Sequence, residues 1–199
     1  MTRAPEVGTA QDPDAVLVQQ ASAGDMAAFE QLVMRHADAL HGALLRFGLD
    51  HGEAQDVAQE TFLRAWRSLS RFEARSRFFT WLYRIGFNEA QRRLAKRPAA
   101  GAVVSTEDRP LDDLAAEGPG PVGTLEREEL RATLAEGLRE LPADLRAPVV
   151  LRDVEGLSTS EAASVLDLGE AAFKSRLHRG RMALRAMLAP RLSGLPGFG

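Results

Sequence analysis

Apolar residues recur along most of the chain at intervals of three and four, the spacing that gives a helix one buried face. In the first half this pattern predicts helices over residues 14–20, 26–47, 50–69 and 76–97. Asp14 is expected to cap the first helix, and Asp50 with Glu53 forms a capping box that opens the third. Pro98 ends the fourth helix because proline cannot continue the helical hydrogen bonds.

The helical pattern breaks off between residues 98 and 123, which are rich in Ala, Gly, Pro and acids and include Gly118-Pro-Gly-Pro121. Such a composition is typical of a flexible linker. The helical spacing then returns over residues 125–141, 142–154, 158–166 and 170–189, with Pro148 expected to kink or shorten the second of these helices. We therefore predict an all-α fold of two small helical domains, 14–97 and 124–189, joined by a flexible acidic linker, with a flexible N-terminus (1–13) and tail (190–199).

The last two predicted helices form a helix-turn-helix. A capping box, Ser158 to Glu161, opens the first, and the tight turn at 167–169 separates it from the second. The second helix has an apolar face of Phe173, Leu177, Leu184 and Leu188 and a basic face of Lys174, His178, Arg181 and Arg185, flanked by Ser175, Arg176 and Arg179. A helix fits the DNA major groove, so we expect its early residues to contact base edges and its later arginines to hold phosphates. A solvated basic face is the alternative.

Composition and charge narrow the function classes. The chain contains no cysteine, which excludes disulfides and thiolate chemistry, and no apolar run approaches the roughly 20 residues that span a bilayer. The N-terminus does not resemble a signal peptide, so we expect a cytoplasmic protein without membrane insertion. The net charge of -3 conceals two basic segments: residues 62–97 carry ten Lys or Arg and two acids, and residues 158–199 carry six and three. These segments predict two contacts with a polyanion, with solvated helix faces as the alternative.

The first basic segment is also rich in aromatic residues. Cations interleaved with rings suit single-stranded nucleic acid, because bases stack on the rings while the cations hold phosphates. We nevertheless place Phe62, Trp66, Trp81 and Leu82 in the helix core. Phe72 and Phe78 flank the predicted loop at residues 70–75, and either interpretation stays open for them.

Two stretches of the first domain resemble region 2 of bacterial sigma factors of the extracytoplasmic-function (ECF) group. They are Asp56-Val-Ala-Gln-Glu-Thr-Phe-Leu-Arg-Ala-Trp-Arg-Ser-Leu69 and Phe78-Phe-Thr-Trp-Leu-Tyr-Arg-Ile-Gly-Phe-Asn88. Two stretches of the second domain, Glu155-Gly-Leu-Ser158 and Phe173-Lys-Ser-Arg-Leu-His-Arg-Gly-Arg181, resemble region 4 of the same group. The resemblance spans about residues 14–97 and 124–189, in the family's order on either side of the linker.

The resemblance implies a promoter-specificity subunit that binds core RNA polymerase, recognises the −35 and −10 elements and helps to melt DNA. It implies contact with the clamp of the largest polymerase subunit through Asp56, Gln59 and Glu60, and contact of region 4 with the flap of the second largest. For the −10 element and its melted non-template strand it implies Arg71, Phe72, Glu73, Arg75, Ser76, Arg77, Asn88, Arg92 and Arg93. For the −35 duplex it implies Ala171, Ala172, Lys174, Ser175, Arg176, His178, Arg179 and Arg181. A solvated polar cluster is the alternative for the clamp residues.

The resemblance further implies an anti-sigma partner that holds the two domains together. The linker occupies the place where relatives enter the polymerase channel, and its acids either mimic nucleic acid there or form a plain spacer. Two departures from the family pattern stand out. Gly86 and Phe87 replace a small aliphatic residue and Ala, and Ala171 with Ala172 cannot donate hydrogen bonds to DNA.

Two other classes of protein compete with this interpretation. A helix-turn-helix regulator explains residues 158–189 but neither the Gln59-Glu60 segment nor the aromatic basic segment, and it would footprint promoter DNA without polymerase. An enzyme would need an acid–base arrangement, a Gly-rich phosphate loop or a metal-ligand cluster, none of which is recognisable, and His178 has no second ligand at metal-binding spacing. We therefore expect no catalysis, no cofactor and no metal.

Overall fold

The computed structural model describes residues 12–96 and 124–192, which are helical and contain no strand. The N-terminal unit consists of α1 (Ala15–Ser22), α2 (Met26–Phe47), α3 (His51–Ser68), the short 3-10 helix η1 (Leu69–Arg71) and α4 (Phe78–Lys96). The C-terminal unit consists of α5 (Thr124–Glu140), α6 (Ala143–Val149), the π-helical turn η2 (Val150–Val154), α7 (Thr159–Val165) and α8 (Glu170–Leu192). The prediction of an all-α fold with two helical units is confirmed. The predicted linker, 98–123, lies outside the described residues, as do most of both predicted flexible ends.

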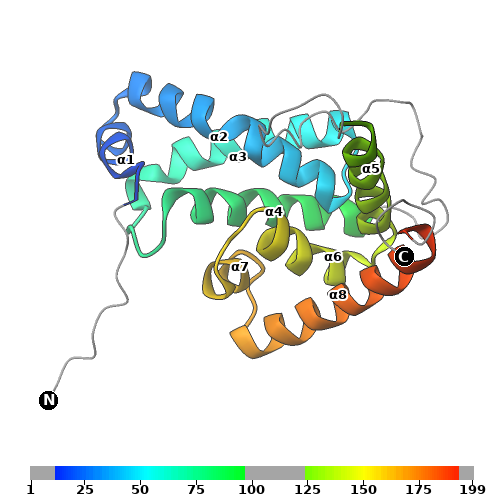
Figure 1. The fold of residues 1–199 in the computed structure, drawn as a ribbon. Coiled ribbons are helices and arrows are strands. Elements are labelled where there is room, and N and C mark those ends of the chain that lie inside the picture. The colour runs from blue at the N-terminus through cyan, green and yellow to red at the C-terminus, as the bar shows by residue number, and fades with distance from the viewer. Residues whose placement is uncertain (1–11, 97–123, 193–199) are drawn as a thin grey trace, which may run out of the picture.

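Helix α2 is the centre of the N-terminal unit, and α1, α3 and α4 pack against it (Figure 1). Its buried face includes Leu32, Leu40 and Leu44, all of which are fully buried, as the apolar spacing predicts. The Asp25 carboxylate caps α2 by accepting hydrogen bonds from two backbone amides of its first turn. The predicted capping box at the start of α3 is present, with both hydrogen bonds between Asp50 and Glu53 formed.

The prediction that Asp14 caps α1 is wrong. Asp14 occupies the N-cap position, but its side chain makes no capping hydrogen bond. Asp14 is instead 1% exposed, and its carboxylate accepts hydrogen bonds from two residues of α2: Arg35, and His36 Nε2 at 2.7 Å. A buried carboxylate needs strong donors, and two cationic or polar side chains satisfy it better than one backbone amide. The Asp14 side chain therefore ties α1 to α2 instead of capping α1.

The C-terminal unit follows the predicted order with two adjusted boundaries. The α-helical register of α6 ends at Val149, one residue after Pro148, and the chain continues as the π-helical turn η2. The capping box between Ser158 and Glu161 opens α7, as predicted. Helix α8 continues through Pro190 to Leu192, three residues beyond the predicted end near residue 189. The Arg191 guanidinium pairs with Glu140 and Glu136 of α5, which holds this last turn of α8 in place.

The two units pack directly on one another (Figure 1). Helix α4 of the first unit lies against α7 of the second, and α2 contacts α5, α6 and η2. The buried residues of both units form one continuous hydrophobic cluster. Within the described parts of the chain, no helix is both long enough and apolar enough to cross a membrane.

Candidate nucleic-acid interface

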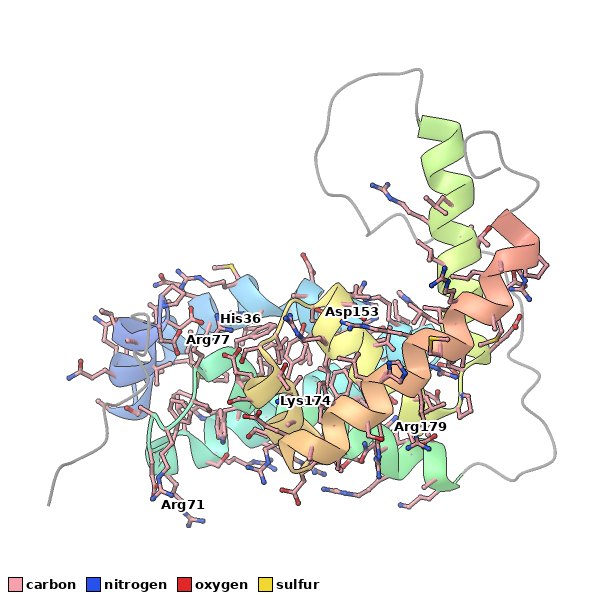
Figure 2. The ribbon with its side chains drawn as sticks, turned by 60° about the horizontal axis from the view of Figure 1, so that its bottom comes forward. His36, Arg71, Arg77, Asp153, Lys174 and Arg179 are labelled. Carbon is pink, nitrogen blue, oxygen red and sulfur yellow. The ribbon has the colours of Figure 1, made fainter. Side chains whose placement is uncertain are left out.

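The first half of α8 presents the residues predicted for the −35 duplex. Ala171, Ala172, Lys174, Ser175, His178 and Arg179 are exposed, and Arg176 is half-buried. The opposite side of the helix is anchored by Phe173, which is fully buried, and by Leu177. Figure 2 shows Lys174 and Arg179 along α8. The Lys174 ammonium lies 3.3 Å from the Glu170 carboxylate, a solvent-exposed pair that is weak enough to exchange for a phosphate.

The turn before α8 sets the direction in which this face points. Asp167 adopts a left-handed conformation with φ of 55°, and the amide of Leu168 donates to the carbonyl of Ala163 at 2.9 Å. Ala163 is buried where α7 and α8 cross. A small residue at this crossing lets the two helices pack closely, so the buried side of α8 faces α7 and its basic side faces solvent.

Arg181 is exposed like most residues predicted for the −35 duplex, but it differs from them in having an ion-pair partner on η2. Its guanidinium donates two hydrogen bonds to the Asp153 carboxylate, at 2.9 and 2.6 Å. This bidentate pair joins α8 to η2 within the C-terminal unit, in a geometry suited to a strong ion pair. The structure therefore gives Arg181 a position in the unit's own packing.

The residues predicted for the −10 strand surround the short segment between η1 and α4. Arg71 is exposed and extends from one end of the molecule in Figure 2. Arg75 and Glu73 are both exposed and pair at 2.6 Å, and Ser76 is half-buried. Arg77 differs from them, because its Nε donates to Oε1 of Glu161 on α7 at 2.7 Å.

Most of the aromatic residues of this segment build the core. Phe78 is fully buried, and Trp66 packs on Phe29 with ring centroids 4.9 Å apart. Phe72 is half-buried and lies at the edge of this cluster, with its ring centroid 5.0 Å from that of Trp81. The placement of Phe62, Trp66, Trp81 and Leu82 in the core is confirmed, with both tryptophans at its partly exposed border. Phe78 therefore belongs to the core, and Phe72 keeps an accessible edge.

The remaining −10 candidates lie along α4, and one of them meets the clamp candidates. Arg92 is exposed and pairs with Glu89 at 2.8 Å, whereas Asn88 is half-buried. Arg93 Nη1 lies 3.4 Å from Oδ2 of Asp56, a residue predicted to contact the polymerase clamp. Arg93 thus stands beside the polar face of α3.

The clamp candidates form a shallow polar depression of about 440 Å³ between α3 and α4. Asp56 and Gln59 are exposed, and Glu60 is half-buried. The Glu60 carboxylate accepts a hydrogen bond from Arg64 Nε at 2.7 Å, which lowers the pKa of Glu60. Leu63, with 45% of its surface exposed, adds an apolar contact beside these charges. The depression thus offers a partner a fixed carboxylate, an amide and one exposed apolar side chain.

A second hollow, of about 750 Å³, lies between α5, η2 and α8. Its apolar lining includes Leu134, Leu138, Leu184 and Leu188, and its charged lining consists of Arg46, Arg131, Asp153, Arg181 and Arg185. We call it the leucine groove. Leu184 and Leu188 belong to the predicted apolar face of the last helix, and Leu134 on α5 is 36% exposed. Two leucine stripes on helices that face each other were the only signal in the sequence for this groove.

Comparisons with known proteins identify both units. Residues 32–99 match Sigma-70 region 2, and residues 131–184 match Sigma-70 region 4. The RNA polymerase sigma-H factor of Pseudomonas aeruginosa is 37% identical over 191 residues, covering 92% of this chain and 97% of that protein. The chain belongs to the sigma-70 factors of the ECF group. The ECF RNA polymerase sigma-E factor of Escherichia coli K12 is 35% identical over 182 residues, covering 89% of this chain and 95% of that protein.

Two solved structures share this architecture. CnrH in complex with the cytosolic domain of CnrY is 34% identical, with a TM-score of 0.66, and the match covers 89% of this chain and 97% of that one. The sigma factor RpoE from Bartonella quintana, in complex with the anti-sigma factor NepR, is 25% identical, with a TM-score of 0.64. That match covers 81% of this chain and 96% of RpoE.

Packing explains why this chain has Gly86 and Phe87 where the family pattern has a small aliphatic residue and Ala. A Cβ atom at Gly86 would lie 3.1 Å from Leu40 Cδ1 and 3.3 Å from Thr61 Oγ1, so α4 crosses α2 and α3 at close range. The Phe87 ring is fully buried and lies with its centroid 4.8 Å from that of Phe47. Adjacent positions of α4 thus combine a close helix crossing with a large core side chain.

Proposed function

We infer that this chain is a promoter-specificity subunit of bacterial RNA polymerase, which binds the core enzyme, reads the −35 and −10 elements and helps to melt the DNA between them. The observation that carries this inference is that one chain contains both sigma-70 regions, with a basic helix exposed on region 4 and cations around an aromatic edge on region 2. The polymerase performs the chemistry, and this chain supplies recognition.

For the −35 duplex we propose the exposed residues of the first half of α8. Lys174, Ser175, His178 and Arg179 extend from a helix that is anchored on its other side, which suits insertion into the major groove. Ala171 and Ala172 allow close approach and read bases only through apolar contact. Arg176 is half-buried, so its stem would help to hold α8 in place while its guanidinium contacts the DNA. The Arg181–Asp153 ion pair favours a structural role for Arg181 instead.

For the −10 strand we propose the segment from Arg71 to Arg77. Exposed cations there would hold phosphates, and the accessible edge of Phe72 would offer a stacking surface to an extruded base. Trapping an unstacked base on a preformed surface offsets the few kcal/mol that flipping costs. Asn88 and Arg92 extend this surface along α4.

For core polymerase we propose two separate contacts. The depression with Asp56, Gln59 and Glu60 would bind the clamp of the largest subunit, and the leucine groove would bind an apolar helix of the flap on the second largest. We also propose control by an anti-sigma factor, because the solved relatives CnrH and RpoE were captured with CnrY and NepR. The absence of any small inhibitory partner in pull-downs from the native host would contradict that control.

Transcription in vitro with purified bacterial core RNA polymerase and a genomic promoter library tests the main inference. Discrete transcripts that require both the core enzyme and this protein would establish the sigma function and define its −10 and −35 preferences. A protein that shifted duplex DNA alone, formed no complex with core and gave no transcripts would be a helix-turn-helix regulator instead.

Substitutions in the two units separate DNA contacts from polymerase contacts. Lys174→Ala or Arg176→Ala should weaken promoter binding while core binding persists, because neither residue lies near the clamp or flap candidates. Gln59→Ala combined with Glu60→Ala should weaken core binding first, measured by gel filtration with core polymerase. Loss of core binding in the α8 variants, with unchanged promoter choice, would contradict these role assignments.

A further inference from the structure

The face of region 2 that we propose for the −10 strand is partly covered by region 4. Helices α4 and α7 pack together (Figure 1). Side chains from α2, α4 and the segment before α4 meet the loop and helix that begin the helix-turn-helix and the turn that follows. The polar contacts at this interface fall into a buried anchor and an exposed rim. Each is built from carboxylates of region 4 and donors of region 2.

Glu155 forms the buried anchor. Its Oε1 accepts hydrogen bonds from Arg46 Nε and Nη2, at 3.1 and 2.6 Å, and its Oε2 accepts one from the Tyr83 hydroxyl at 3.1 Å. The Glu155 side chain is 7% exposed and that of Arg46 is 11% exposed. A buried ion pair with this many hydrogen bonds fixes one docking geometry, because any shift leaves charge unpaired in a dry environment.

Glu161 and Asp167 form the rim. Glu161 Oε1 accepts from Arg77 Nε at 2.7 Å and from the Thr80 hydroxyl at 3.3 Å. Asp167 Oδ1 lies 3.1 Å from Arg84 Nη2. Burial opposes ionisation of Glu161, but hydrogen bonds from Arg77 and from Ser158 outweigh it and lower the pKa of Glu161 to about 2. Glu161 therefore meets region 2 as an anion at neutral pH.

We propose that region 4 inhibits region 2 within the same molecule. The Glu161 carboxylate occupies Arg77, a proposed −10 residue, and the Asp167 carboxylate occupies Arg84, an exposed arginine on α4, which we add to the residues that would hold −10 phosphates. A guanidinium that holds a carboxylate at hydrogen-bond distance has to release it before it binds a phosphate. The two regions separate before the −10 strand binds. The DNA consequence rests on the proposed function, whereas the closed state rests only on the contacts between the regions.

The two classes of contact respond differently to salt. The rim pairs are partly exposed, with the Arg84 and Asp167 side chains 47% and 80% accessible, so salt screens them. The Glu155 anchor is buried and is screened much less. Closure therefore weakens as salt rises but persists until the anchor also opens. Removal of the rim charges alone should shift the equilibrium toward the open form without unfolding either region.

The absence of cysteine makes closure directly measurable. Met34 on α2 and Met182 on α8 are 75% and 53% exposed, so Met34→Cys and Met182→Cys provide two unique labelling sites, one on each region. Single-molecule energy transfer between dyes at these sites should show a predominant high-transfer population in the full-length protein. Glu161→Gln with Asp167→Asn should increase the low-transfer fraction measurably, and Glu161→Gln retains a side chain that can complete the capping box.

A matched control separates the rim from a general charge effect. Glu136→Gln with Glu140→Gln changes the net charge of region 4 by the same amount, on α5, where these acids face Arg191. This control should keep the high-transfer population. Reversal of one pair, Arg84→Asp with Asp167→Arg, should restore closure that either single reversal weakens. Equal transfer in all variants, or equal opening in the control, overturns the inference.

The effect of opening on DNA binding is then measured as the affinity for a fluorescein-labelled single strand of about 15 nucleotides with random sequence. The Glu161→Gln, Asp167→Asn protein should bind this strand severalfold tighter than the wild type, and the Glu136→Gln, Glu140→Gln protein should not. An opened variant that binds no tighter overturns the inhibitory role. If wild-type protein still supports promoter-specific transcription with core polymerase, the proposed function stands in spite of that result.

Discussion

Gly180 lies where α8 crosses α6, and the close approach of the two helices predicts that only glycine fits. A Cβ atom at this position would lie 2.6 Å from the carbonyl oxygen of Leu145 and 2.9 Å from Val149 Cγ2, and Cβ atoms are essentially never found within 3.0 Å of other atoms. The first of these neighbours is backbone and cannot rotate away. Gly180→Ala therefore forces α8 away from α6.

The size of the effect follows from two opposing contributions. Alanine is favoured over glycine by about 1 kcal/mol in a helix interior. Overpacking of a tight core costs about 1–3 kcal/mol, and contact with a backbone atom places Gly180→Ala at the upper end of that range. We expect a net destabilisation of about 1–2 kcal/mol. At roughly 2–4 °C per kcal/mol for a protein of this size, the thermal midpoint should fall by several degrees.

Chemical denaturation with two probes tests this expectation. Both tryptophans, Trp66 and Trp81, lie in the N-terminal unit, so tryptophan fluorescence follows that unit, whereas far-ultraviolet circular dichroism follows both. Gly180→Ala should shift the circular dichroism transition at least as far as the fluorescence transition. The control is Gly52→Ala in α3, where a Cβ would meet only Asp50 Oδ1, at an ordinary contact distance of 3.6 Å. This substitution should stabilise the protein by up to about 1 kcal/mol. If Gly180→Ala stabilised the protein as the control does, the argument from close approach would be wrong.

Three further predictions concern charges. The pKa of Glu161, about 2, lies below its ordinary value of 4.5. The ionised Glu161 carboxylate should therefore stabilise the closed state fully above about pH 4.5, and this stabilisation should disappear as the pH falls toward 2. Glu161→Gln should abolish this part of the pH dependence of energy transfer. Asp14→Ala should lower the free energy of unfolding by about 1–3 kcal/mol because it leaves the buried His36 ring nitrogen without its partner. Asp25→Ala, which removes a cap, should cost about 1 kcal/mol in the same denaturation series. Promoter binding by the holoenzyme should weaken steeply with salt, and Lys174→Ala should reduce the slope by about one unit in filter binding if Lys174 holds a phosphate.

The two units illustrate how far local patterns reach. The capping boxes at Asp50 and Ser158 and the helix-turn-helix spacing were predictable because each depends on residues within a few positions of one another. Asp14 shows the limit of the same rule. It has the residue type and position of a cap, but α2 brings two stronger donors to its carboxylate. Local geometry permitted one hydrogen bond, and tertiary packing supplied two better ones.

Charges divide in the same way between sequence and structure. The sequence alone determined which segments are basic, which face of α8 is basic and which residue types gather on α3, because helical periodicity places residues on faces. It did not determine the partner of each charge. The Arg46–Glu155 pair joins residues 109 positions apart, and the Arg77–Glu161 pair joins residues 84 positions apart. No pattern in the intervening sequence predicts either contact. The packing of α2 against η2 decides the first pair and that of α4 against α7 the second, because long side chains bind whichever opposite charge the fold brings within reach.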